Sequence, residues 1–436
     1  MAEVTIEVSL ASGRSVLVPA GINSTVLDLK MAAQEALGAP FLQLLAEGGG
    51  ILDPALPLAM AGLRDGDRLI GVVRPPSMLA TKFSFCLWWL GGGVLTWGHR
   101  DAEVGCLRES LQQVLHVRSS WETFTATLLD GRIITWGGFP GFGGADFQEK
   151  LRSAIQVQEA DVAVAAILAD GSVIAAGDEE KGGDCSEVQD QLQEVQELWA
   201  TGGAFAALLR DERIVTWGDP GCGATSEVLR NVKQVKATGG AFAFLLAGGA
   251  VIAQGDPEYG GDCAAVQDRL QNVQQLAATD KSFAAVLSDN SIVTWGSLPD
   301  DTNEVPAMLS QQVKSMCSTG GAFAALQMDG SIIAWGSPKC GGDSSNVQEQ
   351  LRNVEEVCGT DRAFATLLTD GRVVTWGDPE WGGDSRHVQE QLVHVQQLKA
   401  TLGAFAALTA DGALVAWGKP HYGGDCTAIE DEVKKL

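Results

Sequence analysis

The sequence predicts a mostly β chain, in which an array of about nine short repeats follows a small α+β domain. A Trp-Gly dipeptide, or a variant of it, recurs every 37 to 41 residues from Trp97 to Trp417. An Asp-Gly turn between two apolar, β-prone runs precedes many of these dipeptides, which is a strong hairpin signal. Self-similarity at this period indicates a propeller or a solenoid, because one unit cannot bury its apolar faces without its neighbours.

Each repeat is expected to hold three strands and a short helix, as residues 360–401 illustrate. A strand over 363–368 and an Asp370-Gly371 turn precede a second strand that ends at Trp376-Gly377. Val388, Leu392 and Val395 then follow at helical spacing, behind a cap at Asp384 or Ser385. The equivalent strand ends, each followed by Gly, are Trp97, Trp136, Ala176, Trp217, Gln254, Trp295, Trp335, Trp376 and Trp417.

The first strand of each hairpin carries small alanines around one large aromatic residue, as in Ala363-Phe364-Ala365. A strand with one wet face would alternate apolar and polar residues, and these strands do not. We therefore expect both faces of each hairpin to pack against neighbouring sheets.

Residues 1–73 do not share the repeat and predict a β-grasp domain. Residues 25–37 have the apolar spacing of a helix, with Ser24 or Thr25 as its cap. Strand-like runs flank this helix and give the order ββαββ, at residues 4–10, 15–18, 41–45 and 68–73. Residues 74–79 then read as a Pro-rich linker, since paired prolines favour extended backbone. The repeats fill residues 80–436.

Composition excludes several classes of function. The net charge is −25 and no basic cluster is present, so nucleic acid is not an expected partner. The nine cysteines form no CxxC pair and do not cluster with histidines at zinc-ligand spacing, so we expect reduced thiols and no bound metal. No signal peptide or membrane-spanning apolar run is visible, which predicts an intracellular protein, cytoplasmic or nuclear. No catalytic or cofactor motif stands out, so the chain is not expected to be an enzyme.

The repeat pattern AFAxLxDGxVxTWGxxxxGGD resembles that of the regulator-of-chromosome-condensation family, whose members form β-propellers. The Asp-Gly turns, the Trp-Gly strand ends and the aromatic-Gly-Gly loops at Tyr259, Trp381 and Tyr422 carry the resemblance. The Gly-His and Trp-Asp dipeptides of WD40 repeats are absent. Gly-Gly-Asp followed by Val-Gln-x-x-Leu replaces the family's usual Gly-Gln-Leu-Gly-like tail, so a guanine-nucleotide-exchange surface does not transfer residue by residue. The resemblance implies a propeller. Nine units exceed the usual four to eight blades, so either one unit lies outside the ring or the array does not close.

Residues 3–73 resemble a ubiquitin-like domain through the hairpin, the helix and the final DGDRLIGVV run. The resemblance implies that Leu44 and Val72 lie near an apolar patch that ubiquitin-pathway receptors recognise. No Gly-Gly follows Val73, and Lys30 is the only lysine in the domain. We therefore expect an integral module that is not conjugated.

The Gly-Gly-Asp loops are the candidate site, because equivalent loops of a propeller gather on one rim. Aromatic residues beside adaptable glycine loops are typical of a protein-binding surface. In the plainer alternative, each Gly-Gly makes a turn and each Asp caps the next helix. The candidate rim consists of Asp184, Asp262, Asp343, Asp384, Asp425, Tyr259, Trp381 and Tyr422.

The sequence as a whole predicts a non-enzymatic protein-binding scaffold or adaptor. Its propeller would be the interaction platform, for a partner with a basic surface, and its N-terminal domain a docking module. The alternative is a component of ubiquitin ligation, related to HECT ligases but without their catalytic domain, or a guanine-nucleotide-exchange regulator.

Overall fold

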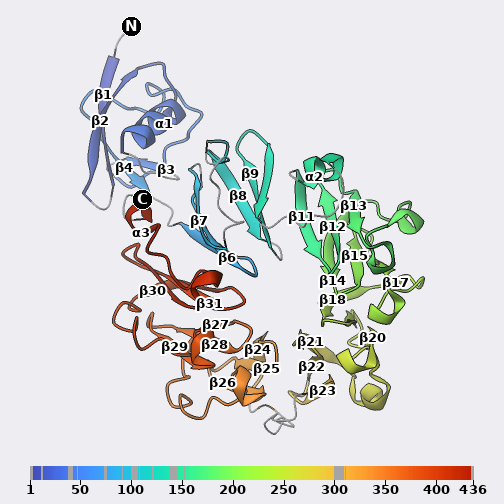
Figure 1. The fold of residues 1–436 in the computed structure, drawn as a ribbon. Helices are drawn as coiled ribbons and strands as arrows, with labels where there is room; N and C mark the ends of the chain where they lie inside the picture. Colours follow the sequence, from blue (N-terminus) through green and yellow to red (C-terminus); the bar gives the residue numbers. More distant parts are fainter. Residues whose placement is uncertain are drawn as a thin grey trace.

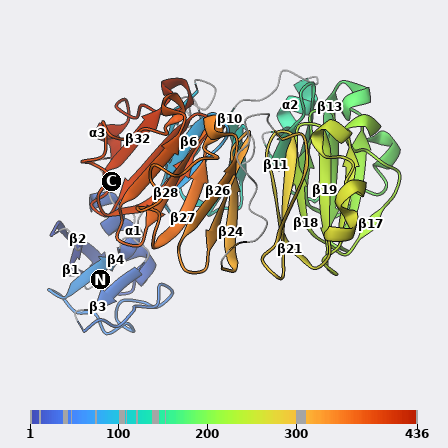
Figure 2. The ribbon, with the colours of Figure 1, turned by 90° about the horizontal axis from the view of Figure 1, so that it is seen from below.

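A ring of small β-sheets makes up most of the molecule, and the N-terminal domain lies outside this ring next to the C-terminal helix α3 (Glu430–Val433; Figure 1). Figure 2 shows the same arrangement from below. This computed structural model describes residues 3–10, 13–37, 43–46, 48–72, 76–90, 92–99, 107, 109–119, 122–137, 145–151, 153–298, 309 and 311–433.

The N-terminal domain is a four-stranded mixed sheet with helix α1 on one face. Its strand order is β2-β1-β4-β3, in which β1 and β4 are parallel and the other pairs are antiparallel. Apolar residues on one side of the sheet, such as Ile6, pack against Leu29 of the helix. The elements are β1 (Glu3–Leu10), β2 (Ser15–Gly21), α1 (Val26–Leu37), β3 (Gln43–Ala46) and β4 (Arg68–Val72).

Helix α1 begins behind Thr25, one of the two residues that the sequence suggested as its cap. The backbone N–H of Asp28 donates to the Thr25 hydroxyl, and the Asp28 carboxylate accepts from the backbone N–H of Thr25. These reciprocal bonds satisfy two donors that the first turn of a helix leaves unpaired. They also hold the pKa of Asp28 below its usual value.

Outside this domain, the described residues form nine small antiparallel sheets, which we call blades 1 to 9. Blades 1 to 4 are β5 (Ser77–Ala80), β6 (Ser84–Trp88) and β7 (Val94–Gly98); β8 (Val114–Ser119), β9 (Thr123–Leu128) and β10 (Ile133–Gly137); β11 (Ala154–Glu159), β12 (Ala163–Leu168) and β13 (Val173–Gly177); and β14 (Val195–Ala200), β15 (Ala204–Leu209), β16 (Arg213–Gly218) and β17 (Leu229–Arg230). Blades 5 to 9 are β18 (Val232–Ala237), β19 (Ala241–Leu246) and β20 (Val251–Gly255); β21 (Val273–Ala278), β22 (Ser282–Leu287) and β23 (Ile292–Gly296); β24 (Val313–Ser318), β25 (Ala322–Gln327) and β26 (Ile332–Gly336); β27 (Val354–Gly359), β28 (Ala363–Leu368) and β29 (Val373–Gly377); and β30 (Val395–Ala400), β31 (Ala404–Thr409) and β32 (Leu414–Gly418).

The first strand of each blade faces the axis of the ring. First strands contact those of neighbouring blades, as β14 does with β11 and β18. Several of them are also joined by a glutamine side chain. In one such pair, Gln156 of blade 3 donates to the Leu198 carbonyl of blade 4 and accepts from the Leu198 N–H. These contacts give the radial order of a β-propeller.

The middle strand of each blade is buried on both faces, as its alanine-rich sequence predicted. Phe364 is fully buried, and its ring stacks on that of Trp376 directly across the hairpin, with the centroids 5.2 Å apart. The alanines on the other face, such as Ala363 and Ala365, pack against Phe405 of the next blade. A phenylalanine–tryptophan stack of this kind occurs in seven blades.

The strand-end tryptophans of blades 1, 4, 6, 8 and 9 also join each of these blades to the one before it. Trp217 Nε1 of blade 4 donates to the carbonyl of Gly182, which follows blade 3, at 3.0 Å. Gly182 has a φ of +89°, and a Cβ there would come within 2.7 Å of the Phe205 ring, so this contact between the two blades requires glycine. The same bond from Trp97 of blade 1 to the Gly423 carbonyl, at 3.1 Å, closes the ring.

Two expectations about the repeat need correction. The short helix expected in every unit is an α-helix in α2 (Ala145–Leu151) and α3 (Glu430–Val433) and a 3-10 helix in η4 (Ser186–Val188) and η7 (Ala264–Arg269), whereas Val388 lies in a turn. A segment this short makes few i to i−4 bonds, so a helix there gains little from cooperativity. Residues 77–79, assigned to the linker from the sequence, belong to β5, where they pair with β6. Arg74 and Pro75 of that linker lie outside the described residues.

Candidate protein-binding face

Two kinds of loop meet at one end of the ring, which we call the loop face. The loops between first and second strands begin with threonine in most blades, and a 3-10 turn follows the third strand. A backbone bond joins the two loops of each blade, as from the Asp378 N–H to the Arg362 carbonyl at 2.9 Å. The turns are η3 (Glu179–Lys181), η5 (Pro220–Cys222), η6 (Pro257–Tyr259), η8 (Pro338–Cys340), η9 (Pro379–Trp381) and η10 (Pro420–Tyr422).

The loop threonine fixes the last residue of the turn. The Thr401 hydroxyl donates to the Tyr422 carbonyl at 2.7 Å and accepts from the Ala404 N–H. Thr360 holds Trp381 in the same way. The Tyr422 ring then lies so close to Gly403 that a Cβ there would come within 2.7 Å of it. Threonine therefore fixes the turn that carries Trp381 or Tyr422, and a glycine leaves room for the ring of Tyr422.

A belt of backbone hydrogen bonds joins the loops of neighbouring blades at this face. The Leu402 N–H of blade 9 donates to the Lys82 carbonyl of blade 1 at 2.7 Å, which also closes the ring. The Asp361 N–H donates to Leu402, and equivalent bonds continue back to Asp161 of blade 3. Because each bond joins adjacent blades, the loops form a rigid support for their side chains.

Several carboxylates lie close to one another on the inner side of the loop face. Burial raises the pKa of Glu159 to about 8, with a further contribution from the nearby negative charge of Glu122, while Lys82 acts in the opposite direction. Partial burial and the negative charge of Asp361 raise the pKa of Asp280. Both Asp280 and Asp361 lie over Gly320, where an added Cβ would meet each carboxylate within 3.0 Å.

The aromatic side chains of blades 8, 9 and 1 form a continuous row on the loop face. The ring of Trp381 lies 6.0 Å from that of Tyr422, which lies 5.5 Å from Phe83. Phe83 in turn lies 5.8 Å from His99. Each of the first three side chains is half-buried and His99 is exposed, so the row is accessible from solvent. Tyr259 of blade 5 has the equivalent position but lies apart from this row.

Cations lie over these rings. Lys419 Nζ is 3.6 Å from the centroid of Trp381, and the Arg362 guanidinium is 5.2 Å from it. Lys82 Nζ is 5.0 Å from the centroid of Phe83. Such contacts contribute about 0.5–1 kcal/mol at exposed positions. We call these residues the aromatic–cationic patch: Lys82, Phe83, His99, Arg362, Trp381, Lys419 and Tyr422.

The aspartates of the predicted rim occupy turns. Each carboxylate accepts a hydrogen bond from the backbone N–H two residues later, as Asp262 does from Ala264 at 2.8 Å. Asp384 also accepts from the Arg386 side chain, and together these bonds lower its pKa to about 2. The others bonded in this way are Asp184, Asp343 and Asp425. The structure thus brings Trp381 and Tyr422 together, but it shows the aspartates as turn caps and no contact between them and the rings.

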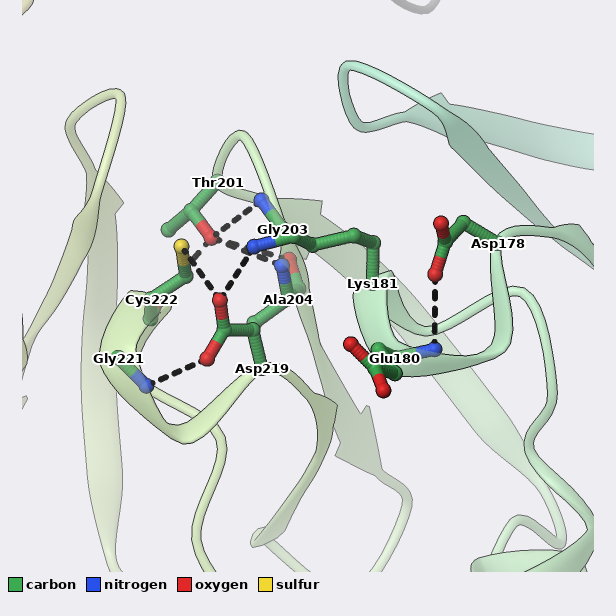
Figure 3. Close-up of polar contacts among 9 residues, drawn as sticks. All are labelled: Asp178, Glu180, Lys181, Thr201, Gly203, Ala204, Asp219, Gly221 and Cys222. Carbon is green, nitrogen blue, oxygen red and sulfur yellow. Dashed lines mark hydrogen bonds and ion pairs between the residues drawn. The ribbon is translucent and has the colours of Figure 1, made fainter.

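Blades 3 and 4 fill the same positions of the loop face differently. The last turn residues are Lys181 and Cys222 rather than aromatics, and Lys181 Nζ pairs with the Asp219 carboxylate at 2.5 Å (Figure 3). Cys222 Sγ lies 3.7 Å from the same carboxylate. Burial and the Asp219 charge raise the pKa of Cys222, so this thiol is a poor nucleophile.

The described residues offer no obvious catalytic or metal centre. None of their His, Cys, Asp and Glu side chains form a group of three or more that could hold a metal ion. The described cysteines are free thiols, and burial raises the pKa of Cys317 to about 12 and of Cys426 to about 11. Cys106 lies outside the described residues. Within the part of the chain that the structure describes, none of the helices has the length and apolarity needed to cross a membrane.

The patch expected on the N-terminal domain needs correction. Leu44 is only 1% exposed and belongs to the core beneath α1. Its neighbour Leu45 is directly opposite Ile70 on β4, on the other face of the sheet. Ile70 and Val72 are 43% and 36% exposed, so Val72 does lie on a surface with apolar character. Successive side chains of a strand face opposite sides, and the prediction chose the wrong member of the pair.

Comparison with known proteins leaves the family unassigned. No known family profile matches the chain, and no curated protein sequence matches it. Prp20p of Saccharomyces cerevisiae, the yeast RCC1, is 15% identical over 70% of this chain and 83% of its own, with a TM-score of 0.38. That structure was described with its binding to Gsp1p and histones.

Two further solved structures are similar to different parts of the chain. The CRINKLY WD40 ectodomain of an Arabidopsis thaliana receptor kinase is 13% identical over 59% of this chain and 90% of its own, with a TM-score of 0.33. A designed protein based on ubiquitin is 23% identical over 16% of this chain and 89% of its own, with a TM-score of 0.16. These scores are too low to support any functional inference, so the architecture rests on the strand pairing and the bonds between blades.

Proposed function

We propose that this chain is a non-enzymatic protein-binding scaffold whose propeller is an interaction platform. The observation that carries the proposal is the row of accessible rings and cations across blades 8, 9 and 1. Trp, Tyr and Arg are the residue types that contribute most to binding energy at protein interfaces. The belt of backbone bonds holds their loops in place, so little conformational entropy is lost when a partner binds.

We further propose that the N-terminal domain is a separate docking module. It precedes β5, and the first strand of a blade runs toward the loop face, so the domain joins the ring at the opposite end. The surface that it would present to a ubiquitin-pathway receptor is Leu45, Ile70 and Val72 rather than Leu44. The two surfaces could then engage different partners at once.

Affinity capture with the full chain tests the platform. We expect the partner captured by the wild-type protein to be lost, by about tenfold or more, in a Trp381→Ala, Tyr422→Ala double variant, since each ring contributes buried contact. Trp199→Ala is the matched control, because Trp199 is half-buried on the inner strand β14 of blade 4, outside the row of rings on blades 8, 9 and 1. Capture that is unchanged in the double variant, or lost equally in the control, would contradict the proposal.

The non-enzymatic assignment is tested against the alternative of ubiquitin ligation. With activating and conjugating enzymes, ubiquitin and ATP, we expect the purified chain to form no thioester on any of its nine cysteines. Thiols whose pKa is raised by burial are rarely ionised at neutral pH and attack slowly. A reducible ubiquitin adduct that disappears when one particular cysteine is replaced would overturn this assignment.

A further inference from the structure

Blade 9 differs from blades 3, 4, 5 and 8 at the residue that precedes its 3-10 turn, whereas blade 7 has Ser337 there, also without a capping bond. Asp178, Asp219, Asp256 and Asp378 each accept a hydrogen bond from the backbone N–H two residues later. Lys419 occupies this position in blade 9 with a similar backbone conformation, and its side chain makes no capping bond. Loss of such a cap costs a helix about 1 kcal/mol. The lysine is therefore unfavourable for the turn itself.

A second position of the same turn changes charge as well. The middle residue is Glu180, Glu258 or Glu380 in blades 3, 5 and 8, and it is His421 in blade 9. Blade 9 thus carries a lysine and a histidine where those three blades carry two carboxylates. The change falls between Trp381 and Phe83, at the centre of the aromatic–cationic patch.

The Lys419 ammonium is directed to the patch instead of the backbone. It lies 3.6 Å from the centroid of the Trp381 ring and forms no ion pair with a described residue. Arg362, on the same ring, is paired with Asp361 at 3.3 Å, and about half of its side chain is exposed. On blades 3 and 4, by contrast, the Asp219 carboxylate neutralises Lys181.

We propose that the aromatic–cationic patch binds an acidic segment of a partner protein. The proposal rests on the proposed function and names the class of partner. Carboxylates of the segment pair with Lys419, Arg362 and Lys82, and its apolar side chains pack on the rings. Ring contacts of 6.0, 5.5 and 5.8 Å carry the patch across three blades, a length that suits an extended segment of several residues.

The charge of the whole chain makes this proposal distinguishable from binding of a basic partner to the aspartates. At a net charge of −25, the long-range field repels an acidic segment, so binding depends on short-range pairs at the patch. Raising the salt from about 50 to about 300 mM should leave the association rate unchanged or raise it, and should speed dissociation. A basic partner steered by the rim would instead associate more slowly in salt.

The test uses the full-length protein and a fluorescein-labelled peptide of about twelve residues, composed of Glu, Asp and Leu. Fluorescence anisotropy should show saturable binding, which Lys419→Glu and Trp381→Ala each weaken by about tenfold or more. Lys233→Glu makes the same charge change at an exposed lysine of blade 5 and should alter the affinity by less than about twofold. A peptide with Lys in place of every acid should not bind. Circular dichroism and denaturant melts confirm that each variant is folded.

Three results would overturn the proposal: no binding of the acidic peptide, equal affinity in Lys419→Glu and Lys233→Glu, or preferential binding of the basic peptide. If one of these occurs while Trp381→Ala, Tyr422→Ala still abolishes partner capture, the class of partner is wrong and the platform stands. If capture is also unaffected, the proposed function fails as well.

Discussion

Blades 3 and 4 and blades 8, 9 and 1 present the same loops at the same face of the ring, yet only the second group presents a row of aromatic rings. Blade 4 resembles blades 8 and 9 in its loop threonine, in the glycine after the turn and in a tryptophan bonded to the preceding blade. Blade 3 has Ala160 and Ala176 at the threonine and tryptophan positions. The two groups differ at the last residue of the turn and at its cap. Blades 3 and 4 pair Lys181 with Asp219, whereas blade 9 places Lys419 on Trp381.

The comparison shows that the repeat builds the ring and that departures from the repeat give one sector its surface. A residue that lowers the stability of its own turn is expected to serve another purpose, such as binding of a partner. Function in such a chain is therefore best sought where one repeat breaks the pattern that the others share.

The largest expected effect concerns what the two sectors have in common. Phe205 of blade 4 and Phe364 of blade 8 are fully buried and stack on tryptophans at 5.3 and 5.2 Å. Replacing either with alanine should lower the free energy of unfolding by about 3–5 kcal/mol, the usual cost of truncating a buried aromatic residue. Denaturant melts measure the loss. A value under about 1 kcal/mol in either sector would mean that its middle strand is not packed on both faces, and the shared scaffold would be refuted.

A smaller effect on stability is expected from Glu159 of blade 3, on the inner side of the loop face. Because burial and Glu122 raise the pKa of Glu159 from 4.5 to about 8, the folded state binds this proton more tightly than the unfolded chain. Stability should therefore fall as the pH rises from about 5 through about 8. Glu159→Gln should remove that part of the pH dependence and stabilise the protein by about 1–2 kcal/mol at pH 9, allowing for partial solvent screening.

Denaturant melts at a series of pH values between 5 and 9 test this prediction. Asp161→Asn is the control, because Asp161 is an exposed carboxylate of the same loop. Identical pH profiles for the wild type and Glu159→Gln would contradict the prediction, because they would show that burial does not raise the pKa of Glu159.

Much of the scaffold could be predicted from the sequence because its signals are local and repeated. The Asp-Gly turns, the alanine-rich strands and the Trp-Gly ends each act within a few residues, and every copy reinforces the register of the others. Closure of the ring could not be predicted, because it depends on bonds such as Leu402 to Lys82 between the two ends of the array. The helix expected in each unit forms in only some of the described units, since apolar spacing fits a series of turns equally well.

The site was only partly predictable. Trp381 and Tyr422 were identified by their loops, but Phe83, His99 and the cations were missed because they come from different blades. Lys419 was visible as a lysine where four other repeats have aspartate, a signal that a search for shared residues passes over. Leu44 was misplaced because a one-residue error in a strand exchanges the buried face for the exposed one.

The central claim is that blade 9 lacks a turn-capping residue because this position serves the binding surface. A single substitution at Lys419 tests it most directly. Lys419→Asp restores the residue that caps the equivalent turn in blades 3, 4, 5 and 8. Unfolding free energy and affinity for the acidic peptide are measured on the same full-length preparation. We expect stability to rise by about 0.5–1 kcal/mol, through the new hydrogen bond to the His421 N–H, and affinity to fall by about tenfold or more. Lower stability together with unchanged peptide affinity would contradict the account.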